Sequence, residues 1–172
     1  PLGLDNIQTG DAFNFTDVYW QHEWVNNSAR FTLGKLNGAS VFDHNTIASD
    51  PNSQYISVPF CMSSVVPYPG HIATAILGVD LNEAWTVRIG ASNLLGTTAS
   101  TGFQDLDEGR FLWQGQIQWS TPKDARPGRY RLHGWYADAQ GGGGGGIGVN
   151  FEQKMSDQVT IFCRGGVGSD RT

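Results

Sequence analysis

The sequence has few charged residues, few cysteines and no long apolar run. Asp, Glu, Lys and Arg make up 16% of its 172 residues, and the formal net charge is −5 without any basic cluster. A nucleic-acid partner is therefore not expected, since such proteins gather Lys and Arg on one face. No stretch of about 18 apolar residues occurs, and this excludes a transmembrane helix.

Motifs of catalytic and metal sites are also missing. The four histidines lie on separate segments and share no metal-ligand spacing: His22, His44, His71 and His133. Cys61 and Cys163 are far apart, which leaves a disulfide open, and Cys163 falls on an apolar face, where a buried thiol is expected. We expect no catalytic residues, no metal and no cofactor, and therefore not an enzyme.

What the sequence does contain is strict alternation, most clearly in Arg110 to Ser120, RFLWQGQIQWS. Every second residue is apolar or glycine (Phe111, Trp113, Gly115, Ile117, Trp119), while the others include three glutamines. A period of two predicts a β-strand, because a helix would mix the two sets.

The two faces of this strand favour a membrane. The polar face carries uncharged glutamines, and the apolar face has tryptophans near both ends, as in membrane strands with aromatic girdles. The 23 glycines and the 12% aromatic content point the same way. A strand of a soluble β-sandwich with a Trp-rich core fits this segment equally well.

Similar patterns predict about eight antiparallel strands, joined by short turns that alternate with long loops. The predicted strands are residues 13–25, 29–36, 72–81, 84–91, 110–120, 129–138, 147–155 and 158–166. We therefore predict an all-β fold, an antiparallel up-and-down transmembrane β-barrel, with residues 1–172 in a single barrel domain.

Three segments break the alternation. Residues 37–70 contain four prolines and no sustained period, which predicts a long loop folded into the lumen or over its mouth, with a short helix around Phe42 to Ala48. The tract Gly141–Gly146 is predicted to be a flexible loop, and so is the end from Gly165 onward.

The strand over residues 129–138 helps to choose between the two β architectures. Arg129, Arg131 and His133 share one face, opposite Tyr130 and Leu132. Three such side chains are costly in a dry sandwich core but suit a water-filled lumen.

A series of motifs resembles the carbohydrate-selective porin (OprB-like) family of Gram-negative outer membranes. The motifs are GKLNGASVFDHNTIASDPNSQYIS, PYPG, WTVRIGASN, GRFLWQGQIQW, PGRYRLHGWY and VNFEQKMSDQVTIFCRGG. The resemblance implies a sixteen-stranded outer-membrane barrel that passes sugars by diffusion. Family members are much longer, so the chain is expected to supply about eight of sixteen strands, the N-terminal and middle part of the pattern. Cys61, Cys163 and the hexaglycine tract depart from it.

A sugar channel would bind solutes weakly through polar side chains on the lumen face. The predicted pore-lining or sugar-contact residues are Arg88, Gln114, Gln116, Gln118, Arg129, Arg131, Glu152, Lys154 and Arg164 from strands, with Asp43 and Asp50 from the long loop. The expected partners are small sugars and outer-membrane lipid, with a homo-oligomer or larger membrane assembly left open. The alternatives are a soluble carbohydrate-binding β-sandwich and a structural outer-membrane barrel component without transport.

Overall fold

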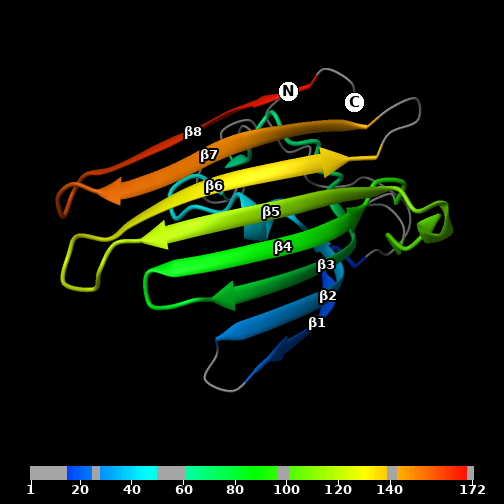
Figure 1. The fold of residues 1–172 in the computed structure, drawn as a ribbon, viewed down its shortest axis with the longest axis horizontal. Coiled ribbons are helices and arrows are strands. Elements are labelled where there is room, and N and C mark those ends of the chain that lie inside the picture. Colours follow the sequence, from blue (N-terminus) through cyan, green and yellow to red (C-terminus); the bar gives the residue numbers. More distant parts are fainter. Residues whose placement is uncertain (1–14, 25–27, 50–60, 97–100, 139–142, 170–172) are drawn as a thin grey trace.

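The computed structural model describes residues 15–24, 28–49, 61–96, 101–138 and 143–169. Within them, eight strands form one curved antiparallel sheet in sequence order (Figure 1). The strands are β1 (Val18–Glu23), β2 (Ala29–Asn37), β3 (His71–Asp80), β4 (Trp85–Asn93), β5 (Phe111–Ser120), β6 (Gly128–Ala137), β7 (Gly144–Lys154) and β8 (Thr160–Gly168). A single up-and-down sheet confirms the predicted architecture and rules out a β-sandwich, which requires two packed sheets.

The two long connections leave the same end of the sheet. They join β2 to β3 and β4 to β5, whereas the ends of β3 and β4, of β5 and β6 and of β7 and β8 that are joined by short connections lie at the opposite end (Figure 1). This asymmetry is typical of outer-membrane barrels. In the described residues β1 and β8 form the two edges of the sheet, so these eight strands do not close on themselves. Among the same residues, no helix is long and apolar enough to cross a bilayer.

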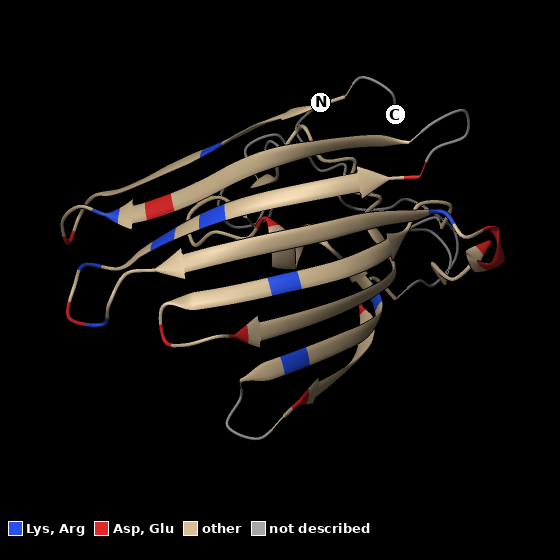
Figure 2. Ribbon diagram, in the orientation of Figure 1, with Lys and Arg blue, Asp and Glu red and all other residues tan. Residues whose placement is uncertain are grey.

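Polarity across the sheet is the reverse of that in a water-soluble protein. On the outer face of the sheet, the apolar side chain of Leu132 in β6 is 52% exposed. On the concave face, the polar side chain of Gln116 in the neighbouring strand β5 is only 3% exposed. Figure 2 shows how few charged positions occur along the strands compared with the turns. Soluble proteins rarely expose a continuous apolar surface of this extent, so the outer face is built for an apolar environment.

Two rows of aromatic residues border the outer face. Near the short turns, the cross-strand register aligns Trp85, Trp119, Tyr130 and Phe151 on four adjacent strands. Near the long loops, Trp113 lies opposite Tyr136. Aliphatic side chains fill the band between these rows, as expected for aromatic girdles at two membrane interfaces.

The hexaglycine tract is not wholly a loop, and that prediction was wrong for its second half. Gly144, Gly145 and Gly146 begin β7, and β8 continues to Gly168 through glycines that were also predicted to be a loop. A Cβ atom on Gly146 would lie 2.7 Å from Trp135 Nε1 and 2.5 Å from the Val167 carbonyl oxygen. At Gly146 there is no space for a side chain, because the indole of Trp135 and the backbone of β8 occupy it.

The two cysteines do not form a disulfide. Cys61 is buried, whereas Cys163 is exposed on the apolar outer face of β8. The expected burial of the Cys163 thiol was therefore wrong, because the apolar face on which it lies is the outside of the sheet and not a core.

Candidate pore-lining surface

The described residues between β2 and β3, 38–49 and 61–70, lie against the concave face of the sheet and are called the inward segment below. Its helix α1 (Ala39–Phe42) crosses that face with the Phe42 ring stacked on His133 at 5.9 Å between ring centroids. A Cβ atom on Gly90 would lie 2.9 Å from Phe42 Cζ, so glycine at this position makes room for the ring. Gln116 Nε2 donates to the carbonyl oxygen of Phe42. The start of the inward segment therefore packs against β4, β5 and β6.

Asp43 is the first polar anchor of this segment. Arg164 Nε donates to Asp43 Oδ1 at 2.9 Å, and the two side chains are 8% and 4% exposed. Asn150 Nδ2 donates to the same Oδ1 and to the Asp43 carbonyl oxygen, both at 2.9 Å, while the Ser63 backbone N–H donates to Oδ2. Burial raises the pKa of the Asp43 carboxyl, and Arg164 opposes that shift. The buried ion pair joins the segment to β7 and β8.

Glu152 on β7 is the second anchor. Its Oε2 accepts hydrogen bonds from the backbone N–H of Thr46, at 2.7 Å, and from the Thr46 hydroxyl. Its Oε1 accepts from Arg131 Nη2 at 3.1 Å and from Arg129 Nη1 at 3.3 Å. Glu152 therefore connects the inward segment to β6 and β7 together.

The predicted helix around Phe42 to Ala48 was misplaced. The helix is Ala39–Phe42, and the residues after it form bends in which Asn45 Oδ1 accepts from the backbone N–H groups of Ile47, at 2.9 Å, and Ala48, at 2.6 Å. An Asn side chain that bonds nearby N–H groups competes with helix formation. The turn presents Asp43 and Thr46 to the wall of the sheet.

The predicted pore-lining side chains fall into two groups that differ in burial. Those on the strands lie on the concave face, and Asp50 is outside the described residues. Six are buried beneath or within the inward segment: Asp43, Gln114, Gln116, Gln118, Arg131 and Glu152. Arg88, Arg129, Lys154 and Arg164 are less buried, although Arg164 holds Asp43 and Lys154 pairs with Asp157 at 2.9 Å. Much of the predicted lining therefore holds the segment in place.

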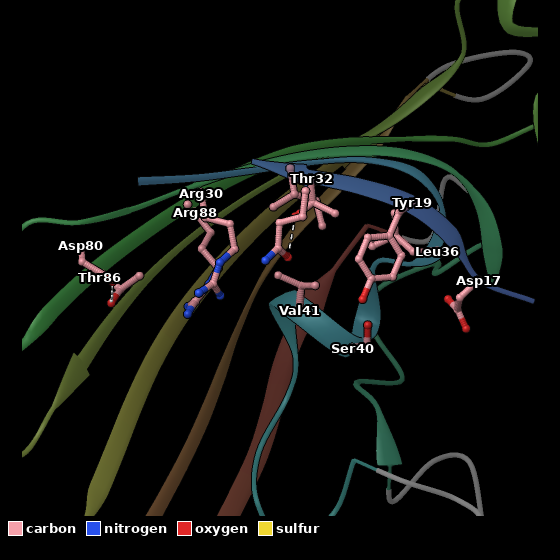
Figure 3. A pocket seen from close by; sticks show the side chains of 13 residues that line it. Asp17, Tyr19, Arg30, Thr32, Leu36, Ser40, Val41, Asp80, Thr86 and Arg88 are labelled. Carbon is pink, nitrogen blue, oxygen red and sulfur yellow. Dashed lines mark hydrogen bonds between the residues drawn. The ribbon is translucent and has the colours of Figure 1, made fainter. Parts of the chain in front are cut away.

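A cavity of about 400 Å³ lies on the concave face beside α1, between β1, β2, β3 and β4 (Figure 3). Of the predicted residues it includes Arg88, and it also contains polar side chains that were not predicted: Asp17, Tyr19, Gln21, Arg30, Thr32, Ser40, Asp80 and Thr86. The alternation that places Arg88 on the lumen face also places Arg30, Thr32 and Thr86 there, so this signal was present in the sequence. Only the structure shows that α1 leaves this part of the wall open.

Comparison with known proteins agrees with this architecture. The sequence profile described as "Carbohydrate-selective porin, OprB family" matches residues 4–143. The high-pH structure of OprB from Pseudomonas putida is similar in fold, with a TM-score of 0.71 at 16% sequence identity, covering 91% of this chain and 46% of that chain. No curated protein sequence matches.

The chain thus spans less than half the length of the solved porin that it resembles. The similarity in fold and the family profile together agree with the exposed apolar face, the polar concave face and the inward segment. This chain belongs to the carbohydrate-selective porin family, OprB type, of the Gram-negative outer membrane.

Proposed function

We propose that this chain forms part of the wall of an outer-membrane channel through which small sugars diffuse passively. The observation that carries the proposal is the inverted sheet: its apolar face is exposed, while its polar face borders a cavity beside an inward-folded segment. The apolar face contacts outer-membrane lipid, and the polar face lines the passage. Membership of a carbohydrate-selective porin family supports sugars as the solutes.

Passage of sugars requires no covalent chemistry. Around the cavity, Gln21 and Thr86 offer amide and hydroxyl groups, and Tyr19 adds an aromatic ring. Sugar hydroxyls exchange hydrogen bonds with water for bonds with these groups, and the ring packs on the apolar face of a sugar. Each contact is weak, which permits release. The fold and family are those of a channel, and we propose transport without an enzymatic step.

Flux through the complete protein tests this proposal. Liposomes that contain it should swell in isosmotic glucose at a rate well above that of empty liposomes, and more slowly in a large oligosaccharide that the passage excludes. Protein that has been denatured before reconstitution is the control. A structural barrel component without transport would instead leave the swelling rate in glucose equal to that of empty liposomes.

The lipid-facing assignment makes a separate prediction. Leu132→Arg places a charge in the middle of the exposed apolar band, and we expect it to destabilise the bilayer-inserted protein by about 2–4 kcal/mol. Gln158→Arg, in the exposed turn between β7 and β8, is the matched control and should change stability little. Urea unfolding in lipid bilayers measures both. Equal stability of the two variants would contradict contact between this face and lipid.

A further inference from the structure

The guanidinium groups of Arg88, Arg129 and Arg131 form one hydrogen-bonded network on the concave face, and this network contains a single carboxylate, that of Glu152. Arg129 and Arg131 both donate to Glu152 Oε1, at 3.3 and 3.1 Å, and the other oxygen of Glu152 accepts from Thr46. Arg88 makes no ion pair within the described residues and donates Nη1 to Gln116 Oε1 at 2.9 Å. In this network, positive charge exceeds negative charge, and hydrogen-bond donors exceed acceptors.

Gln118 links the two sides of this network. Its Oε1 accepts from Arg131 Nε at 2.9 Å and from Arg88 Nη1 at 3.4 Å. One carbonyl oxygen has two lone pairs, so its capacity is used by these two donors. Arg131 Nη1, on a side chain that is 3% exposed, is buried without an acceptor among the described residues. An unsatisfied buried donor of this kind is costly and marks a place short of acceptors.

Arg88 is the open end of the network. It lines the cavity beside α1, and Figure 3 shows its side chain reaching from the sheet into that space. Gly78 lies directly opposite on β3, so no neighbouring side chain covers the Arg88 stem there. Within the described residues, its Nε and Nη2 groups make no hydrogen bond, and these two form the side-on edge of a guanidinium. That edge matches the two oxygens of a carboxylate or phosphate.

The two carboxylates that line the same cavity have other contacts. Asp80 Oδ1 accepts from the Thr86 hydroxyl at 2.6 Å, and Asp17 contacts His71 at 3.2 Å. Arg30, which also lines the cavity, pairs with Glu23 at 2.8 Å. The side-on edge of Arg88 is therefore left for a solute.

We propose that the Arg88 side-on edge, supported by Arg131 through Gln118, binds the carboxylate or phosphate group of an acidic sugar. This inference rests on the proposed channel function and specifies the class of sugar that the passage favours. The solute anion supplies the acceptors that the arginine network lacks. Because the site faces water, the interaction is weak and releases the sugar.

Glucuronate and glucose form a matched pair of probes, since they differ at one carbon that carries either a carboxylate or a hydroxymethyl group. In liposomes with the complete protein, Arg88→Gln should lower the glucuronate-to-glucose flux ratio by about tenfold, the effect of losing one charge-assisted bidentate contact. Arg88→Lys keeps the charge without the planar edge and should give an intermediate ratio. Lys123→Gln is the charge control, because Lys123 is 84% exposed in a turn and pairs with Glu83.

The inference is overturned if Arg88→Gln leaves the ratio unchanged, or if Lys123→Gln lowers it equally, which would indicate a general charge effect. A failure of the channel proposal can be told apart from a failure of the anion-site proposal, because it would appear as absence of glucose flux in the unsubstituted protein. In that case, saturation-transfer NMR with glucuronate on the detergent-solubilised complete protein still decides the anion site. A signal lost in Arg88→Gln and kept in Lys123→Gln supports it, and a signal that Arg88→Gln retains rejects it.

Discussion

Asp43→Ala is expected to release the inward segment from the wall of the sheet. The substitution removes the carboxylate to which Arg164 Nε, Asn150 Nδ2 and the Ser63 N–H donate. Arg164 and Asn150 keep hydrogen bonds to backbone carbonyl oxygens, but the buried charge of Arg164 loses its counter-charge. Removing one partner of a buried, hydrogen-bonded ion pair costs about 3–5 kcal/mol, mostly because the remaining charge is uncompensated. We expect the inward segment to detach from the sheet while the sheet stays folded, because the strands keep the hydrogen bonds between them.

Two measurements follow the release of the segment. Limited proteolysis should cut it faster in Asp43→Ala, and single-channel conductance of the complete protein should rise because less of the passage is obstructed. Asp157→Ala is the matched control, since it removes a carboxylate that pairs with Lys154 while 99% exposed, and exposed pairs contribute little. Unchanged proteolysis and conductance in Asp43→Ala would show that the ion pair does not hold the segment.

Gly146→Ala is expected to disrupt the pairing of β7 with β8. The added Cβ would lie 2.5 Å from the Val167 carbonyl oxygen, 2.7 Å from Trp135 Nε1 and 2.9 Å from Gly168 Cα. Two of these atoms belong to the backbone of β8 and cannot move without distorting the ladder. Overpacking of this kind costs about 1–3 kcal/mol and sometimes more, so the folded fraction in bilayers should fall.

Gly115→Ala is the control for the same chemical change. A Cβ at Gly115, on the outer face of β5, meets nothing within 4 Å, and alanine in a strand loses less conformational entropy on folding than glycine. This variant should be as stable as the unsubstituted protein or slightly more stable, whereas Gly146→Ala is destabilised in urea titrations. Equal midpoints for the two variants would mean that β8 adjusts and that glycine is not required at position 146.

Arg110 to Ser120 shows what the sequence determined by itself. A strand has a period of two whatever lies around it, so alternation assigned Trp113 and Ile117 to one face and Gln114 and Gln116 to the other. The tryptophans and the uncharged glutamines then predicted that the apolar face is the outer one, and the structure exposes that face. The same local rule predicted the eight strands and the lumen face of Arg88 and Arg131, because it depends only on neighbouring residues.

The tertiary structure decided what each lumen residue does. Asp43 and Arg164 are 121 residues apart, and no local pattern shows that they form a buried pair while Arg88 is left beside a cavity. Gly144 to Gly146 looked like a loop because glycine has little strand preference. Only the positions of Trp135 and β8 explain why glycine is needed at Gly146. Periodicity fixes the direction in which a side chain points, whereas its partner depends on segments that folding brings together.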